Sequence, residues 1–165
     1  MSRYALTDLP HGKSQGTRPF AKQVKTQDMQ TKADHEIEKI LRQAGLRPTR
    51  QRIALAQLLF GGEDRHVTAE LLHSEVEAIG EQVSLATVYN TLHQFKRAGL
   101  VRELAIDSTK TYFDTNTSNH NHYLLEPDGV LMDIPGHEIR VDGLPTPPEG
   151  TRISHIDVVV RLVKE

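Results

Sequence analysis

The chain has 165 residues, with 20 Lys and Arg against 22 Asp and Glu, nine His and no Cys, so its formal net charge is −2. This length suits one large domain or two small ones. The lack of Cys excludes disulfides, thiolate zinc sites, iron–sulfur clusters and cysteine nucleophiles. No run approaches the roughly 18 apolar residues of a membrane span, and the first 25 residues lack the apolar core of a secretory signal, so we expect a cytoplasmic protein with no membrane partner.

The charge is unevenly distributed along the chain. Residues 1–33 hold six basic and two acidic side chains, whereas residues 106–165 hold five basic and ten acidic ones. The first segment is also rich in Gln, Thr, Ser and Gly. We therefore predict a basic, flexible N-terminal arm over residues 1–33.

Four helices are predicted between residues 34 and 99. Three are expected to begin after a side chain that can cap them and the second near a proline, and each is expected to end at a glycine. The expected starts are Asp34, Pro48–Thr49, Thr68 and Ser84, and the glycines are Gly45, Gly61, Gly80 and Gly99. Apolar residues recur at helical spacing; those expected to face inward in the last two helices are Leu71, Leu72, Val76, Ile79, Val88, Leu92 and Phe95.

Beyond Gly99 the pattern predicts two short strands, residues 100–106 and 110–114, around the turn Asp107–Ser108–Thr109. Packed helices followed at once by a hairpin are typical of a winged helix, in which the last helix enters the DNA major groove. The fourth predicted helix is polar on the face expected to be exposed, where Tyr89, Asn90 and Thr91 lie. Asn can pair with adenine, and Arg can hold phosphates. The predicted DNA-binding residues are Arg47, Arg50, Arg52, Ser84, Thr87, Tyr89 and Asn90.

His120 and His122 flank a single residue. On a strand, residues i and i+2 point to the same face, so both imidazoles can bind one ion. Two nitrogen donors with carboxylates suit Fe, Mn or Zn. An isolated His-x-His pattern is more often incidental, so these two residues alone do not decide whether the protein has a metal site.

Several segments together resemble the ferric uptake regulator family. Val83–Glu103 (VSLATVYNTLHQFKRAGLVRE) resembles its recognition helix and wing entry, and Ala44–Arg52 (AGLRPTRQR) the junction of its first two helices. His66–Leu72 (HVTAELL) resembles its third-helix start, and Phe113–His122 (FDTNTSNHNH) its metal-ligand segment. The resemblance implies an α+β fold, with a winged-helix DNA-binding domain over 34–114 and a small α/β dimerisation and sensing domain over 115–165.

The resemblance also implies the rest of a metal site and its use. Carried over by position, His66, Asp114 and Asp133 join His120 and His122 as ligands of one divalent ion. The site would lie between the two domains, so that the ion selects the arrangement in which two recognition helices fit two half-sites. The implied partners are a second copy of the chain and an AT-rich palindromic DNA operator.

Departures from the family pattern are informative. Leu125 and Asp128 replace the first Cys pair of many members, so no structural zinc held by four cysteines is expected. Asn119 and Asn121 replace ligands of the second site found in some members, although His155 remains. The Cys-free His-Asn-His segment and long arm resemble the iron response regulator branch of alphaproteobacteria. That branch implies control of iron and haem-synthesis genes, possible contact with the haem-synthesis machinery, and His120 and His122 as candidate haem ligands.

Three other functions compete with this interpretation. A manganese-responsive or peroxide-responsive regulator of the same family would use the same five ligands. A metal-dependent hydrolase is disfavoured because Tyr123, Leu124 and Leu125 follow the His pair where one large hydrolase family continues with Asp-His. A purely structural dimerisation module is disfavoured by the polar face of the fourth helix, so we predict a regulator and not an enzyme.

Overall fold

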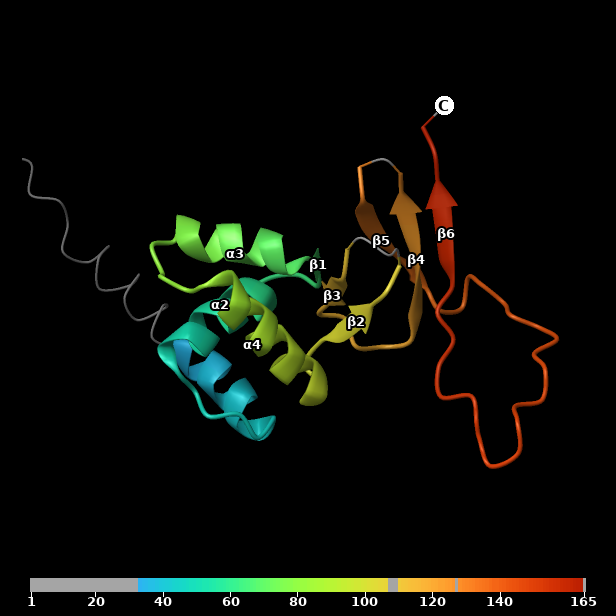
Figure 1. Cartoon of the computed structure of the whole chain (residues 1–165), viewed down its shortest axis with the longest axis horizontal. Coiled ribbons are helices and arrows are strands. Elements are labelled where there is room, and N and C mark those ends of the chain that lie inside the picture. Colours follow the sequence, from blue (N-terminus) through green and yellow to red (C-terminus); the bar gives the residue numbers. More distant parts are fainter. Residues whose placement is uncertain (1–32, 107–109, 127, 165) are drawn as a thin grey trace, which may run out of the picture.

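The computed structural model describes residues 33–106, 110–126 and 128–164. The predicted arm, apart from residue 33, and the predicted turn Asp107–Ser108–Thr109 lie outside the described residues. Helices and a small sheet form one unit, and a second sheet with a long loop forms the other, as Figure 1 shows.

The helical unit contains a helix over residues 33–43, α2 (Arg50–Phe60), α3 (Ala69–Ala78) and α4 (Leu85–Arg97). The predicted caps Thr68 and Ser84 are confirmed, and Thr49, near which the second helix is expected to begin, also caps its helix. The side chains of Thr49, Thr68 and Ser84 accept hydrogen bonds from backbone N–H groups three residues later, and each satisfies a donor left free at a helix start.

The predicted cap at Asp34 is wrong, because residue 34 already lies inside the first helix. Its carboxylate instead accepts a hydrogen bond from the Gln57 amide of α2. The predicted end of that helix at Gly45 is confirmed. Gly45 has φ of +73°, and the Leu46 N–H donates to the Leu41 carbonyl at 2.8 Å, which closes the helix.

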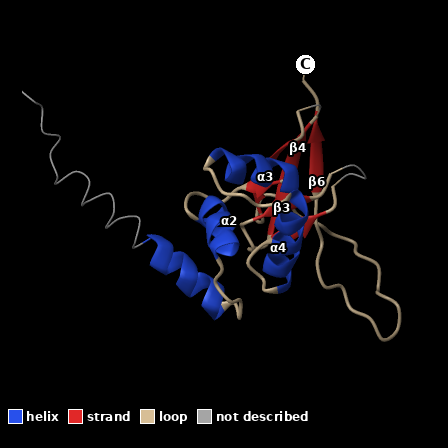
Figure 2. Cartoon of the chain, turned by 60° about the vertical axis from the view of Figure 1, so that its left-hand side comes forward, coloured by secondary structure: helices blue, strands red, loops and turns tan. Residues whose placement is uncertain are grey.

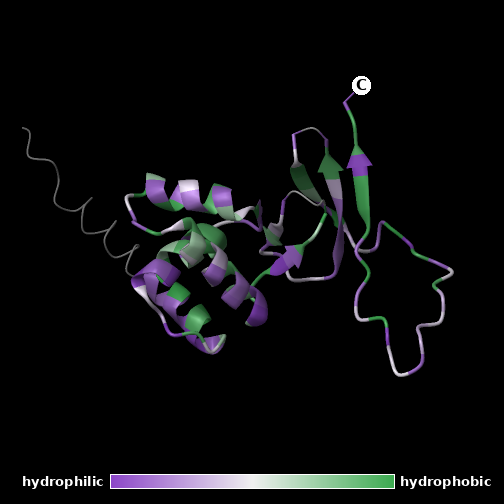
Figure 3. Ribbon diagram, in the orientation of Figure 1, coloured by the Kyte–Doolittle hydropathy of each residue, from purple (hydrophilic) through white to green (hydrophobic). Residues whose placement is uncertain are grey.

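The core of this unit joins the inner faces of the helices to the wing. Its fully buried side chains include Leu41, Leu55, Leu59, Leu72, Val76, Val88, Leu92, Phe95 and Phe113. Figure 3 shows apolar residues concentrated at α2, in the middle of the unit. Two residues predicted to face inward near α3 are exposed instead, Leu71 by 45% and Ile79 by 55%. Leu71 lies off the helix face that buries Leu72 and Val76, and Ile79 is the C-cap, beyond the last residue of α3. Conversely, Thr91 of α4 was expected outside and is buried.

The first sheet has three antiparallel strands in the order β1-β3-β2. These are β1 (His66–Val67), β2 (Arg102–Leu104) and β3 (Tyr112–Asp114). The predicted hairpin is confirmed by β2 and β3, which are shorter than expected. The two-residue strand β1 was not predicted, and it brings His66 opposite Asp114.

The second sheet has the order β5-β4-β6 and consists of β4 (His120–Leu125), β5 (Val130–Pro135) and β6 (Val159–Leu162). Strands β4 and β5 are antiparallel, whereas β6 runs parallel to β4. Turned by 60°, Figure 2 also shows the loop between β5 and β6 extending away from the sheet.

The described residues between 115 and 164 form strands and loops and no helix, so this second unit lacks the helix implied by an α/β domain. Pro145, Pro147 and Pro148 lie in the β5–β6 loop, where they remove backbone donors and disfavour a helix. Among all the residues that the structure describes, no helix is long and apolar enough to cross a membrane.

Candidate metal centre

Two cross-strand pairs bring the five predicted ligands together where the two sheets meet. In the first sheet, His66 of β1 is paired with Asp114 of β3. In the second, His122 of β4 is paired with Asp133 of β5, and His120 lies two residues earlier on the same face of β4. Each sheet therefore contributes at least one imidazole and one carboxylate, and His120 adds a third nitrogen.

The donor atoms converge on a small volume. The His120 Nε2 atom lies 3.0 Å from His122 Nε2 and 3.0 Å from Asp114 Oδ2. The His66 Nε2 atom lies 3.0 Å from Asp133 Oδ1, and that oxygen lies 3.4 Å from His120 Nε2. Donors that share an ion at about 2.0–2.2 Å are themselves roughly 3–4 Å apart, so these spacings suit a single metal.

Burial supports the same conclusion. Asp114 and His122 are fully buried and His120 is 4% exposed. Two of the converging atoms, His66 Nε2 and Asp114 Oδ2, have no hydrogen-bond partner among the described residues. Buried polar atoms without partners are costly, and a cation between them would satisfy both. Four of the five residues, His66, His120, His122 and Asp133, place donor atoms within 4.8 Å of one another and are able to hold a metal ion, with Asp114 beside them.

The electrostatics favour a neutral His66 imidazole and an ionised Asp114 carboxylate, the forms that bind metals. Burial lowers the pKa of His66 below its usual 6.5, although Asp114 and Asp133 oppose this shift. Burial alone would raise the pKa of Asp114. Hydrogen bonding to the His122 imidazole and to the Asn116 backbone N–H outweighs burial, so the pKa of Asp114 is lowered below its usual 3.8.

A set of outer contacts not foreseen from the sequence surrounds this group. The Ser118 carbonyl oxygen lies 3.0 Å from His120 Nδ1 and accepts a hydrogen bond from Arg102 at 2.7 Å. Because a carbonyl oxygen can only accept a hydrogen bond, His120 carries its proton on Nδ1. The lone pair of its Nε2 atom then faces the other metal-binding atoms. Arg102 also contacts His155 at 2.8 Å and Asp157 at 2.7 Å, joining β2 to the segment before β6.

The lowered pKa of His66 predicts how the stability of the metal-free protein depends on pH. In the unfolded chain this imidazole takes up a proton below about pH 6.5, whereas in the folded chain it stays neutral to lower pH. The unfolded state then binds more protons, so stability should fall as the pH drops below 6.5. Urea unfolding about one pH unit either side of that value measures this. His66→Gln should flatten the dependence and His35→Gln, outside the cluster, should not; equal slopes in both would contradict the assignment.

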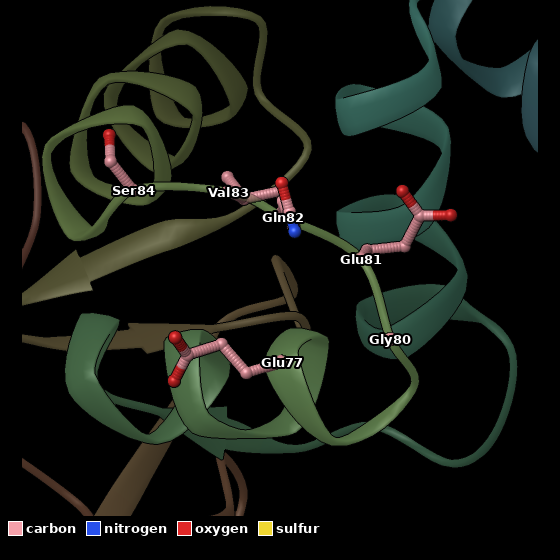
Figure 4. A pocket seen from close by; sticks show the side chains of 6 residues that line it. All are labelled: Glu77, Gly80, Glu81, Gln82, Val83 and Ser84. Atoms are coloured by element: carbon pink, nitrogen blue, oxygen red, sulfur yellow. The ribbon is translucent and has the colours of Figure 1, made fainter.

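The predicted DNA-binding residues belong to two helices: Arg50 and Arg52 lie on α2 with Arg47 before it, and the others lie at the start of α4 and along it. Ser84 caps this helix, and its hydroxyl is 2.9 Å from that of Thr87. Asn90 is exposed, and Tyr89 is partly exposed. Figure 4 shows the loop from Gly80 to Ser84, with Ser84 at the start of α4 and Glu81 directed towards α2.

Besides Ser84 and Thr87, three of these residues have side-chain partners within the chain. Arg50 forms a two-fold hydrogen bond with Glu81, Arg52 donates to the Gln94 amide oxygen, and the Tyr89 hydroxyl donates to Glu70 at 2.6 Å. Arg52 also donates to the carbonyl of Arg47, which lies before α2. The acidic partners of Arg50 and Tyr89 were not foreseen from the sequence.

A winged helix joined to a sheet unit through a buried His/Asp cluster defines a class of protein: the metal-responsive DNA-binding regulators. A model of the ferric uptake regulator family matches residues 43–160. The chain belongs to the ferric uptake regulator family. Members of this family are transcription regulators and not enzymes; they bind DNA and form dimers.

Individual relatives agree with this assignment. The chain is 38% identical over 104 residues to the peroxide-responsive repressor PerR of Staphylococcus aureus, a match covering 61% of this chain and 70% of the repressor. It is similar to the ferric uptake regulator of Pseudomonas aeruginosa solved with manganese, at 28% identity and TM-score 0.59, covering 78% and 97% of the two chains. The Vibrio cholerae ferric uptake regulator, at 22% identity, TM-score 0.60 and coverage of 77% and 98%, shares the fold.

Proposed function

We propose that this chain is a dimeric transcription regulator whose affinity for DNA is set by a divalent metal bound by His66, Asp114, His120, His122 and Asp133. The observation that carries the proposal is that donors from both sheets converge within hydrogen-bonding distance of one another. Bound there, the ion would supply positive charge to two carboxylates and link the units. We place the domain boundary between residues 114 and 115, so that the ion favours one relative placement of the two domains.

The donor chemistry favours Mn, Fe or Zn. Three imidazole nitrogens and two carboxylate oxygens form a mixed, moderately hard set, and no thiolate is available in a chain without Cys. The similar regulator from Pseudomonas aeruginosa was solved with manganese. The lack of Cys also leaves no ligands for a structural zinc of the four-cysteine type.

The signal has two leading candidates. The resemblance to the iron response regulator branch supports control of iron homeostasis and haem-synthesis genes. The 38% identity to PerR supports a peroxide-responsive repressor instead. Adding hydrogen peroxide to the Fe²⁺-loaded and Mn²⁺-loaded proteins distinguishes these two functions. A peroxide sensor should lose DNA binding and yield an oxidised histidine peptide with Fe²⁺ only. An iron sensor should instead bind DNA with an affinity that depends on which of the two metals is bound.

Haem is less favoured than a divalent metal as the group that His120 and His122 bind. Both imidazoles are buried, His122 completely, and their Nε2 atoms face each other at 3.0 Å. A porphyrin could reach either iron-binding nitrogen only after β4 separates from its neighbours. Haem titration of the apoprotein tests this ligand, and contact with the haem-synthesis machinery depends on its outcome.

A second copy of the chain would cover apolar side chains that the single chain leaves exposed. Val130 and Met132 of β5 are 47% and 41% exposed, and Leu144 and Ile153 of the following loop are 48% and 44% exposed. A contiguous patch of exposed apolar groups marks an interaction surface, and these four side chains all belong to the second unit. They support a homodimer formed through residues 115–165.

The DNA-binding proposal is tested with an AT-rich palindromic duplex and α4 variants. We expect the metal-loaded protein to bind as a dimer, with affinity that falls as salt rises, because Lys and Arg displace counterions from phosphates. Tyr89→Ala should weaken binding by about 1–3 kcal/mol if the ring contacts a base. Gel shifts at several salt concentrations measure both effects. His73→Ala, on α3, serves as a control that should leave binding unchanged, and wild-type affinity in Tyr89→Ala would remove α4 from the DNA interface.

A further inference from the structure

The short loop between β3 and β4, residues 115–119, contacts both carboxylates of the metal-binding group. The backbone N–H of Asn116 donates to Asp114 Oδ1 at 2.8 Å. Its side-chain amide nitrogen donates to Asp133 Oδ2 at 2.9 Å. One residue thus holds a carboxylate from each sheet.

The orientation of this amide is set by its other neighbours. The Asn116 Oδ1 atom accepts hydrogen bonds from the Ser118 backbone N–H at 3.1 Å and from the Ser118 hydroxyl at 2.6 Å. A backbone N–H can only donate, so the amide oxygen must face Ser118 and the NH₂ group must face Asp133. The loop therefore gives Asp133 a fixed donor.

Each carboxylate is left with one oxygen directed at the histidines. Asp114 Oδ2 lies 3.0 Å from His120 Nε2 and 3.5 Å from His122 Nε2. Asp133 Oδ1 lies 3.0 Å from His66 Nε2. Asp114 is fully buried and packed in β3, but the Asp133 side chain is 35% exposed, so this second carboxylate depends more on its hydrogen bond for its position.

We propose that Asn116 is a positioning residue for the metal centre, which acts by holding Asp133 so that its Oδ1 atom faces the three imidazoles. The inference rests on the proposed metal-binding function. Outer hydrogen bonds that orient a ligand commonly contribute about 10–100-fold to metal affinity. Asn116 has no role in the five-ligand set itself, and the contribution of its side chain is made through Asp133.

The test uses the full-length protein, with Mn²⁺ to measure affinity and Co²⁺ as a spectroscopic probe. Asn116→Ala removes the amide but keeps the backbone N–H to Asp114, so it isolates the effect on Asp133. We expect Mn²⁺ to bind about 10–100-fold more weakly. The visible absorption of bound Co²⁺, which responds to donor set and geometry, should change. Asn119→Ala, at an exposed residue of the same loop, should match wild type in both.

Two further variants distinguish positioning from general damage to the loop. Asn116→Asp keeps the shape of the side chain and the acceptor for Ser118 but places an oxygen against Asp133, so the Co²⁺ spectrum should again differ from wild type. In an Asp133→Ala background, Asn116→Ala should weaken Mn²⁺ binding no further, because residues that act through one another are not additive.

Each outcome bears on one proposal or on both. Wild-type Co²⁺ spectra and Mn²⁺ affinity in the Asn116 variants would overturn the positioning role and leave the metal site intact. Equal weakening by Asn116→Ala with and without Asp133 would also overturn it, because the effect would then not pass through Asp133. Failure of the wild-type protein to bind either ion would overturn the metal-binding function and the positioning role together.

Discussion

Replacing His120 and His122 together by alanine is expected to abolish metal binding. The change removes two of three imidazoles and leaves His66, Asp114 and Asp133, two of which are carboxylates on different sheets. Neither Asp114 nor Asp133 would then have an imidazole nitrogen of β4 beside it. Equilibrium dialysis against Mn²⁺ or Zn²⁺, followed by metal analysis, should find no bound ion in the variant and one per chain in the wild type.

The double replacement should also remove the coupling between metal and stability. A ligand that binds only the folded chain stabilises it by about 2.7 kcal/mol at a hundred times its Kd, so wild-type thermal unfolding should shift upward with added Mn²⁺. The variant should show no shift. His35→Ala combined with His137→Ala is a matched control, because it removes two imidazoles outside the cluster. A variant lacking His120 and His122 that still binds one ion per chain would show that the site lies elsewhere.

The helices and their ends could be predicted because their causes are local. Thr49, Thr68 and Ser84 each cap a helix through a hydrogen bond to a residue three positions later. Asp34 instead lies inside its helix, and its carboxylate accepts a hydrogen bond from Gln57, which lies 23 residues away. Propensity rules consider neighbours in sequence, and they cannot anticipate a competing partner from another helix.

The candidate metal site was predictable in part for a similar reason. His120 and His122 lie on one face of a strand by simple alternation, and residue spacing therefore paired them. Recognising His66, Asp114 and Asp133 required the resemblance to a family, because their approach depends on strand pairing between segments distant in sequence. Neither residue spacing nor the family resemblance identified Asn116 and Arg102. Their contacts depend on the shape of one loop and on the packing of β2 against the segment before β6.

The arrangement of the five residues suggests how an ion could act on distant DNA. His66 lies two positions before Thr68, the cap of α3, and α3 packs against α4 in the same core. Asp114 ends the strand that pairs with the wing strand β2. An ion held by these residues and by β4 and β5 would therefore fix the helical unit to the second sheet through rigid elements. Such an ion shifts the population of domain arrangements only as far as it binds one better than the others.

Replacing Phe95 by alanine should strongly destabilise the helical unit. Phe95 is fully buried on the inner face of α4, with its ring 5.9 Å from that of Phe60. Removing a buried aromatic ring costs about 3–5 kcal/mol, a large part of the roughly 5–15 kcal/mol that stabilises a typical domain. Urea unfolding of the metal-free protein measures the loss, and DNA binding should fall with it because α4 loses its support.

A matched control separates the loss of core packing from the loss of apolar surface. Leu71→Ala also removes apolar atoms from this unit, but Leu71 is 45% exposed, so it should cost far less than the Phe95 variant. Because His66 and Asp114 belong to the unit that Phe95 supports, metal binding and unfolding compete in Phe95→Ala. Saturating Mn²⁺ should then recover part of the lost stability, whereas it should recover none if His120 and His122 are also replaced. A loss below about 1 kcal/mol in Phe95→Ala would mean that α4 is not supported by this core.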